Sequence, residues 1–293
     1  MKKFAGIVWW ASVAAIVSPL GCSRDDAPEP VITPAVVEVP NKAATKPKGE
    51  TSESHETTAL PVKSATGYGD VTGQFVLAGD VPTPELIVAQ GDPTAKDSAV
   101  CAARAIHSEK LVVDADTKGI RHIFVYLRKA LEIHPNLASS DQAIVVFDQK
   151  SCRFEPHTLL VRTDQSVVIK SGDPINHNTH TNPVLGQSAN YLMKPNDREG
   201  VELANLRAES RPFKVNCDVH PWMTAWWLVL DHPYAAITDE QGRFSINKLP
   251  AGEHEFRVWH EGRYIDRKFM ITVKADQTTA LDPIELPLVL LRP

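Results

Sequence analysis

Beyond residue 66 the chain is a succession of short apolar runs separated by turn residues, and this pattern limits the fold more than any other feature. The runs are rich in Val, Ile, Phe, Trp and Tyr, and 22 prolines and 15 glycines are spread along the chain. Aromatic and β-branched side chains fit a pleated, half-buried surface, whereas Gly, Pro and Asp mark turns. Even RHIFVYLRKAL at residues 121–131, which is long enough for a helix, favours a strand by its composition. We therefore predict an all-β protein, with a further strand at KLVVDA (110–115).

The N-terminus predicts export. Two lysines precede an apolar run from Phe4 to Val17, and Gly21 with Cys22 resembles the end of a bacterial lipobox, in which the cysteine is diacylated. Residues 1–21 are therefore expected to be a lipoprotein signal peptide, with Cys22 as the lipidated first residue of the mature chain. An uncleaved membrane anchor is the alternative, although the apolar run is a little short of the roughly 20 residues of a spanning helix.

Residues 22–66 are a low-complexity mixture of Pro, Thr, Glu, Lys and Ala without apolar periodicity. Such a sequence stays extended and solvated, because it cannot bury enough apolar surface to fold. We predict a disordered tether that holds the folded part away from a membrane surface. The expected location is the periplasmic or cell-surface face of a bacterial membrane, reached through the lipid anchor.

Three cysteines follow Cys22, and an odd number in an exported chain leaves at least one of them unpaired. Cys101 and Cys152 have no histidine or methionine at close ligand spacing, so we predict that they form a disulfide. Closing this loop of about 50 residues would stabilise the fold by roughly 4 kcal/mol in the chain-entropy model. Cys217 is then the free thiol.

The segment KVNCDVHPWMTAWW (214–227) places Cys217, His220 and Met223 at three-residue intervals. A blue-copper centre requires one thiolate, two imidazoles and a weak axial thioether. An upstream loop is expected to supply the missing imidazole, and INHNTH (175–180) offers His177. His180 in the same loop falls outside the four-ligand pattern. We interpret it as a solvated histidine, with an extra ligand or a second metal site as the alternative.

The motif CDVHPWM resembles the short copper loop of amicyanin-type cupredoxins, and His177 followed by Asn178 resembles that family's first ligand and its neighbouring asparagine. The resemblance covers about residues 142–232. It implies a Greek-key sandwich that holds one type 1 copper ion. The ligands that it implies are His177, Cys217, His220 and Met223.

The same resemblance assigns roles around the ligands. Asn178 is expected to tie its loop to the cysteine loop. Pro221, which lacks an N–H, would limit hydrogen bonding near the sulfur and stiffen the loop. Trp222 is a candidate for the apolar patch through which electron partners dock. The tryptophans at 226 and 227 would point to opposite faces of a regular strand, so at least one is expected in the core.

Residues 233–293 resemble a carboxypeptidase-regulatory-like, transthyretin-like β-sandwich, with strands around an Asp/Gly turn and a Pro-Ala-Gly turn. Residues 67–141 are left as an N-terminal β segment. Eight further histidines share no ligand spacing and carry no assignment: His55, His107, His122, His134, His157, His232, His254 and His260.

The leading hypothesis is a membrane-tethered mononuclear copper protein that transfers electrons between a donor and an acceptor protein, both unknown. One alternative is copper binding or trafficking without redox turnover, and another is a metal-free surface module that binds glycan or protein. No nucleophile elbow, glycine-rich phosphate loop or HExxH motif is present, so no enzyme is expected. The net charge of −5 and the lack of a terminal basic block argue against a nucleic-acid partner.

Overall fold

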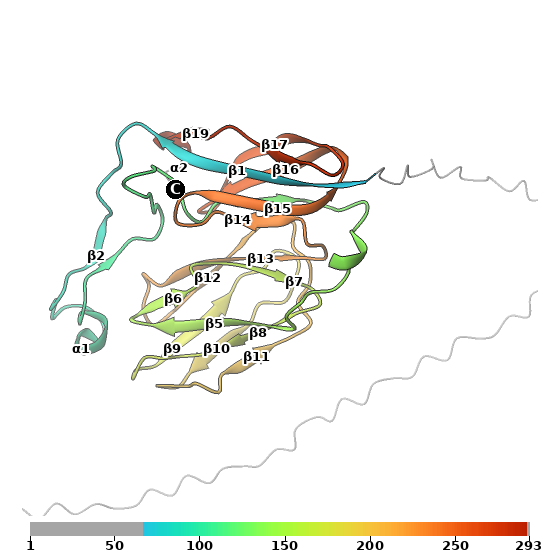
Figure 1. Ribbon diagram of the computed structural model, residues 1–293. Helices are drawn as coiled ribbons and strands as arrows, with labels where there is room; N and C mark the ends of the chain where they lie inside the picture. The colour runs from blue at the N-terminus through green and yellow to red at the C-terminus, as the bar shows by residue number, and fades with distance from the viewer. Residues whose placement is uncertain (1–66, 292–293) are drawn as a thin grey trace, which may run out of the picture. The chain divides into compact units, whose positions relative to one another are not determined.

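The computed structural model describes residues 67–291, which form strands connected by loops, as the all-β prediction requires (Figure 1). The predicted signal peptide at 1–21, lipidated Cys22 and tether at 22–66 lie outside the described residues. Within residues 67–291, no helix is long and apolar enough to cross a membrane. The helical elements there are short: α1 (Ser98–Cys101), the 3-10 turn η1 (Pro135–Leu137) and α2 (Leu288–Leu291).

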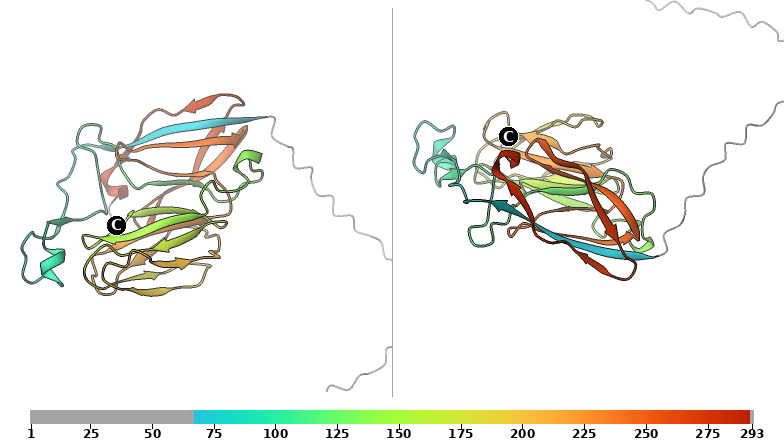
Figure 2. Two further views of the ribbon diagram at one scale, coloured as in Figure 1. Left: turned by 60° about the horizontal axis from the view of Figure 1, so that its bottom comes forward. Right: turned by 90° about the horizontal axis from the view of Figure 1, so that it is seen from above.

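The first of two β-sandwiches packs a five-stranded sheet on a four-stranded sheet (Figures 1 and 2). The five-stranded sheet has the order β10 (Asn190–Met193), β9 (His177–Thr181), β12 (Phe213–Asn216), β13 (Thr224–Leu230), β7 (Thr158–Arg162). The four-stranded sheet has the order β11 (Val201–Leu203), β8 (Ser166–Ile169), β5 (Ile144–Lys150), β6 (Arg153–Glu155). Phe147, Val167 and Trp227 are fully buried between the two sheets.

The second sandwich draws its strands from both ends of the described chain. One sheet contains β1 (Tyr68–Ala78), β15 (Arg243–Pro250), β18 (Thr278–Ala280) and β19 (Ile284–Pro287). The other has the order β14 (Ala235–Ile237), β4 (Phe124–Leu127), β16 (Gly252–His260), β17 (Arg263–Val273). Their shared core includes Val71, Phe75 and Phe256.

These sheets correct the expected boundaries. The N-terminal segment 67–141 is not separate from 233–293, because β1 pairs antiparallel with β15 and parallel with β18 and β19. The apolar residues of β1 alternate along the strand, so one face of β1 enters the core of the second sandwich. Strand β4 likewise pairs with β14 and β16. The second sandwich therefore needs both segments.

All four residues of β4 are buried, since β4 has the second sandwich on one face and the first on the other. We call the contact between the two sandwiches the seam. Its buried side chains are Phe124, Tyr126, Leu228, Leu230 and Trp259. Of the two adjacent tryptophans, Trp227 is buried in the first sandwich, and Trp226 packs on Trp259 at the seam. The prediction that at least one is a core residue is confirmed.

Between β1 and β4 the chain makes a long excursion along the first sandwich (Figure 1). It contains β2 (Leu86–Val88), β3 (Ile106–His107) and α1, and Cys101 in α1 forms the predicted disulfide with Cys152. KLVVDA is not a strand, since Val113 makes only an isolated bridge to Ile120. The histidine-rich segment expected as a loop is instead strand β9, and its first residue is His177.

Candidate metal centre

Three ligand-type side chains come together at one end of the five-stranded sheet. His177 begins β9, Cys217 directly follows β12, and β9 and β12 are antiparallel neighbours. The loop from Cys217 to Met223 closes on itself, because the Cys217 N–H donates to the Met223 carbonyl (3.1 Å) and the Met223 N–H donates to the His220 carbonyl (2.9 Å). This tight loop brings His220 back over the sulfur.

The ligand atoms lie close together and away from water. One atom each from His177, Cys217 and His220 lies within 4.8 Å of the other two. The Nδ1 atoms of His177 and His220 are 3.0 Å apart, and His220 Nδ1 is 3.8 Å from Cys217 Sγ. Both imidazoles are 0% exposed, and Met223, on the same loop, is 1% exposed. Atoms each about 2.0–2.3 Å from one metal ion would have separations of this size.

A carboxylate holds the far nitrogen of each imidazole. His177 Nε2 is 2.9 Å from Asp173 Oδ2, and His220 Nε2 is 3.0 Å from Asp97 Oδ2. Metal-bound histidines commonly donate their other ring N–H to such a group, which fixes the ring orientation and leaves the opposite nitrogen as the ligand. Both Nδ1 atoms therefore face the centre. The donor set fits a borderline or soft metal ion.

The sulfur accepts two backbone hydrogen bonds and lies 3.3 Å from the side-chain oxygen of Asn178. The backbone N–H groups of Asn178 and His220 donate to Cys217 Sγ at 3.5 and 3.4 Å. Asn178 also links the two ligand segments, because its Oδ1 accepts from the Asp218 N–H (2.7 Å) and its Nδ2 donates to Asp218 Oδ2 (2.8 Å). These contacts agree with the linking role expected for Asn178.

The site favours a charge-separated pair. Burial alone would raise the pKa of Cys217, but hydrogen bonds from His177 and His220 outweigh it and lower this pKa to about 6. Burial alone would lower the pKa of His177, but Asp173 and then Cys217 outweigh it and raise this pKa to about 9. Near neutral pH the result is a thiolate beside an imidazolium, and a bound cation would replace the proton of that pair.

The residues predicted around the centre have different surroundings. Pro221 is exposed at the tip of the loop. Trp222 is half-buried, with its ring centroid 5.3 Å from that of His220, and its Nε1 donates to the Cys152 carbonyl (3.1 Å). His180 lies outside the ligand group, with its side chain 32% exposed and Nδ1 3.2 Å from Asp218 Oδ2. Trp222 was expected to belong to an open apolar patch. Among the described residues no such patch is open at His220, because the Asp97 carboxylate lies against its ring.

The two carboxylates were not predicted from the sequence. Asp173 lies four residues before His177, and a carboxylate so close to a candidate ligand is a signal that could have identified it. Asp97 gave no such signal, because it is 123 residues from His220. The disulfide helps to hold it there: the backbone carbonyl of Asp97 accepts from the Cys101 N–H (3.0 Å), while the Cys152 N–H donates to the carboxylate oxygen Oδ2 of Asp173 (2.8 Å). One disulfide therefore joins the two segments that position these carboxylates.

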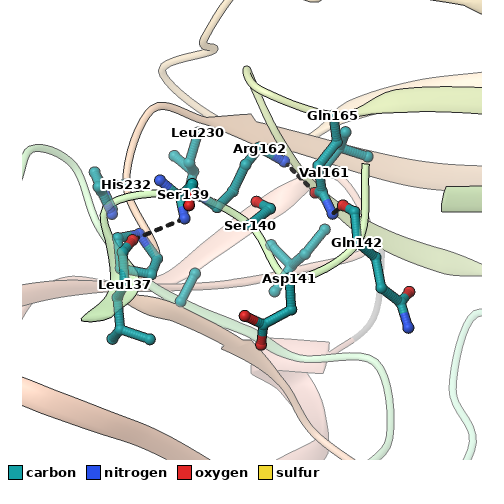
Figure 3. A pocket seen from close by; sticks show the side chains of 13 residues that line it. Leu137, Ser139, Ser140, Asp141, Gln142, Val161, Arg162, Gln165, Leu230 and His232 are labelled. Atoms are coloured by element: carbon teal, nitrogen blue, oxygen red, sulfur yellow. Dashed lines mark hydrogen bonds between the residues drawn. The ribbon is translucent and has the colours of Figure 1, made fainter. Parts of the chain in front are cut away.

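A cavity of about 390 Å³ shares no residue with the metal centre (Figure 3). It lies beside the loop at residues 137–142 and the ends of β7 and β13. Arg162 in its wall donates to the carbonyls of Leu137 and Ala138 (2.9 and 3.1 Å), and Gln165 donates to the Gln142 carbonyl (2.8 Å). These side chains secure the loop, and no cluster of potential metal ligands from residues 67–291 faces this cavity.

Comparisons with known proteins give partial likenesses. No known family and no curated protein matches the chain. Among solved structures, a mutant of amicyanin in the Cu(I) form is 20% identical, covering 31% of this chain and 87% of its own, with a TM-score of 0.26. A purple cupredoxin from Nitrosopumilus maritimus is 18% identical, covering 30% and 99%, with a TM-score of 0.24.

A Cu-containing nitrite reductase from Thermus scotoductus SA-01 is 12% identical, covering 34% of this chain and 27% of its own, with a TM-score of 0.27. All three likenesses concern about a third of the chain. The distances and contacts in the metal centre do not depend on these likenesses.

Proposed function

We propose that the first sandwich binds one type 1 copper ion and that the protein transfers electrons. The observation that carries this proposal is that His177 Nδ1, His220 Nδ1 and Cys217 Sγ lie close together in a buried position. The outer nitrogen of each imidazole contacts a carboxylate. Copper bound there would supply one-electron redox chemistry, with Met223 as the expected weak thioether donor.

The rigidity of the ligands favours electron transfer over copper trafficking. A trafficking site must release its ion to a partner, so its ligands need to be reachable. Here the imidazoles of His177 and His220 are fully buried, and carboxylates, backbone hydrogen bonds and a disulfide-linked segment hold the site in place. A preorganised site that excludes water needs little rearrangement when its charge changes, which is the requirement of electron transfer.

The same observation favours a metal site over a metal-free module. In a binding module with no metal, nothing would require two buried imidazoles to face each other at 3.0 Å beside a free thiol. Two imidazoles and a thiolate directed at one point are the donor groups that a borderline or soft metal ion prefers.

Full-length protein loaded with Cu(II) tests the proposal through its visible and EPR spectra. Electron transfer predicts an intense thiolate-to-copper absorption band with narrow copper hyperfine splitting. Stoichiometric binding without that band would instead indicate trafficking, and no binding would indicate a metal-free module.

We also propose that the protein is exported and lipid-anchored through Cys22, facing the periplasm or the cell surface, where donor and acceptor proteins reach it. Cys22→Ala is expected to leave the copper spectrum unchanged but to release the protein from the membrane fraction. Metabolic labelling with a palmitate analogue checks this, and labelling that survives the substitution would contradict the anchor.

A further inference from the structure

Three buried histidines gather at one end of the seam, and none of them belongs to the metal centre. His157 directly precedes β7 in the first sandwich, whereas His260 is the last residue of β16 and His122 precedes β4 in the second. Their exposed fractions are 4%, 0% and 5%. The ring centroids of His122 and His157 are 4.9 Å apart. Titratable rings from both sandwiches are therefore packed together away from water.

One of the three rings, that of His157, is positively charged near neutral pH. Its Nε2 is 2.7 Å from Glu261 Oε1, and Glu261 Oε2 accepts from Trp226 Nε1 (2.9 Å). Burial opposes the charge of His157, but the bond to Glu261 outweighs burial and raises the pKa of the imidazole. The carboxylate of Glu109, 3.9 Å from His157 Nδ1, acts in the same direction. An ion pair thus joins the two sandwiches.

The other two rings are neutral at the same pH. His260 has no hydrogen-bond partner on either ring nitrogen among residues 67–291. His122 Nδ1 lies 2.8 Å from Thr158 Oγ1 across the seam. Burial, and then the charge of His157, lower the pKa of His122 to about 2. Burial lowers the pKa of His260 to about 4, although Glu261 opposes this shift.

A second positive charge in this cluster would have no counter-charge. Glu261 is already bonded to His157 and Trp226, and no carboxylate of the described chain accepts a hydrogen bond from His122 or His260. The remaining charged side chains that act on the cluster are Glu109, Arg121, Arg153 and Glu155. Glu109 lies beside His157, and Arg121 adds positive charge next to His122. Burying an unpaired charge is costly, so a proton on either neutral ring destabilises the closed seam.

The direction of the pH effect follows from these pKa values. If this end of the seam opens, both neutral rings reach water and regain the ordinary pKa of 6.5. Between pH 6.5 and about 4, the open form then binds a proton at each ring and the closed form binds none. The stability of the closed seam therefore falls as the pH falls through this window. Each ring shifts the equilibrium toward the open form by up to about tenfold per pH unit.

We infer that His122 and His260, packed against the ion pair of His157 and Glu261, make the seam an acid-sensitive switch. In mildly acidic solution their protonation opens this end of the seam, while both sandwiches stay folded. Each sandwich has its own core, and the side chains of the seam form a third cluster, so the seam can open without disruption of either core. The inference goes beyond the copper proposal and does not depend on it.

Tryptophan fluorescence of the full-length protein, without added copper, tests the switch. Trp226 and Trp259 lie at the seam with ring centroids 4.7 Å apart, and both lose apolar neighbours when the seam opens. Emission wavelength and quenching by acrylamide are followed from pH 7 to pH 4. Far-UV circular dichroism of the same samples reports whether the strands remain folded.

The expected result is that the emission of the parent shifts to longer wavelength, and acrylamide quenching increases, before the circular dichroism changes. In a His122→Asn, His260→Phe double variant the midpoint of this change should fall by at least about one pH unit, since neither new side chain titrates. Asparagine tolerates the left-handed backbone of His122, whose φ is 72°. His180→Gln, at a partly exposed position, is the matched control and should behave like the parent.

Fluorescence and circular dichroism that change together in the parent would overturn the inference, because acid would then unfold the whole chain at once. An emission that stays constant down to pH 4 would overturn it too, as would a double variant with the midpoint of the parent. Thermal unfolding at pH 7 checks that the double variant is folded. If it is not, the single variants His122→Asn and His260→Leu replace it, and each should lower the midpoint by part of the shift.

Discussion

Asp97 and His220 are 123 residues apart in the sequence, yet Asp97 Oδ2 lies 3.0 Å from His220 Nε2 and covers the ring. The carboxylate fixes the tautomer of the ligand and places a negative charge next to the metal centre. Its own loop depends on the helical turn that ends at Cys101. The side of the candidate metal centre at His220 is therefore built by a segment outside the sandwich that supplies the candidate ligands.

Replacing Asp97 with asparagine is expected to raise the reduction potential of the copper-loaded protein. The lost negative charge stabilised Cu(II) more than Cu(I), so its removal favours the reduced ion. Copper affinity should also fall by about 10–100-fold. Spectroelectrochemical titration measures the potential. Asp92→Asn is the matched control, because Asp92 is on the same excursion but bonds only to Thr94 and its neighbours. A potential unchanged by Asp97→Asn would contradict the role given to this carboxylate.

Removing the disulfide is expected to affect both stability and the site. A Cys101→Ser, Cys152→Ser double variant should lose about 2–5 kcal/mol of unfolding free energy. Freed from its cross-link, the Asp97 loop should also expose His220, which chemical modification of histidine detects by mass spectrometry. Peptide mapping of the unreduced parent provides the control and should find Cys217 free. An unmodified His220 in the double variant would show that the loop stays in place without the disulfide.

The thiolate and the thioether are expected to have separable effects. Cys217→Ser should abolish the blue absorption band, because a serine hydroxyl supplies no thiolate charge transfer. Met223→Leu should keep the band but raise the reduction potential, since loss of the thioether donor would destabilise Cu(II) more than Cu(I). His180→Ala, outside the ligand group, serves as the control and should change neither. A Met223→Leu protein with no bound copper would make Met223 an essential ligand.

Acid should destabilise the protein through His260. This side chain is fully buried, neither ring nitrogen has a partner among the described residues, and burial lowers its pKa to about 4 from its ordinary 6.5. Between these values the unfolded chain binds a proton that the folded chain does not. Stability therefore falls as the pH falls through this window, by up to about 1.4 kcal/mol per pH unit.

His260→Phe removes this contribution, so urea unfolding from pH 7 to pH 4 should show a shallower loss of stability than in the parent. At pH 7 the variant should be no less stable, because it deletes two unsatisfied polar atoms. His180→Gln, at a partly exposed position, is the control. An unchanged slope in His260→Phe would place the acid sensitivity elsewhere, for example at buried His122, whose pKa burial lowers to about 2.

Local chemistry in the sequence predicted the all-β class and the loop from Cys217 to Met223, but it gave a loop where strand β9 begins at His177. Alternating apolar residues and turn signals act over a few positions, and so do the three-residue ligand spacings. The partners of β1 were not predictable in this way. Its alternating pattern shows that one face is buried, but any sheet edge with a matching face satisfies that pattern, so residues 67–141 were wrongly set apart from 233–293.

The same limit applies to side chains that meet across elements. Asp97, Glu109 and Glu261 look like ordinary surface carboxylates in the sequence, and only the fold places each beside an imidazole. Side chains drawn from separate segments leave no periodic trace in the sequence.

Strands β4 and β14 pair antiparallel at the place where the chain leaves and re-enters the second sandwich. The chain leaves the second sandwich after β4, builds the whole first sandwich, and returns at β14, so Tyr126 and Ala235 are direct neighbours in one sheet. The sandwich that carries the candidate metal centre is thus an insertion whose two ends lie side by side, rather than a domain on a single flexible connection. Two connections restrict rotation of one sandwich relative to the other. The loop from Cys217 to Met223 is therefore expected to keep its orientation relative to β1, where the described chain begins.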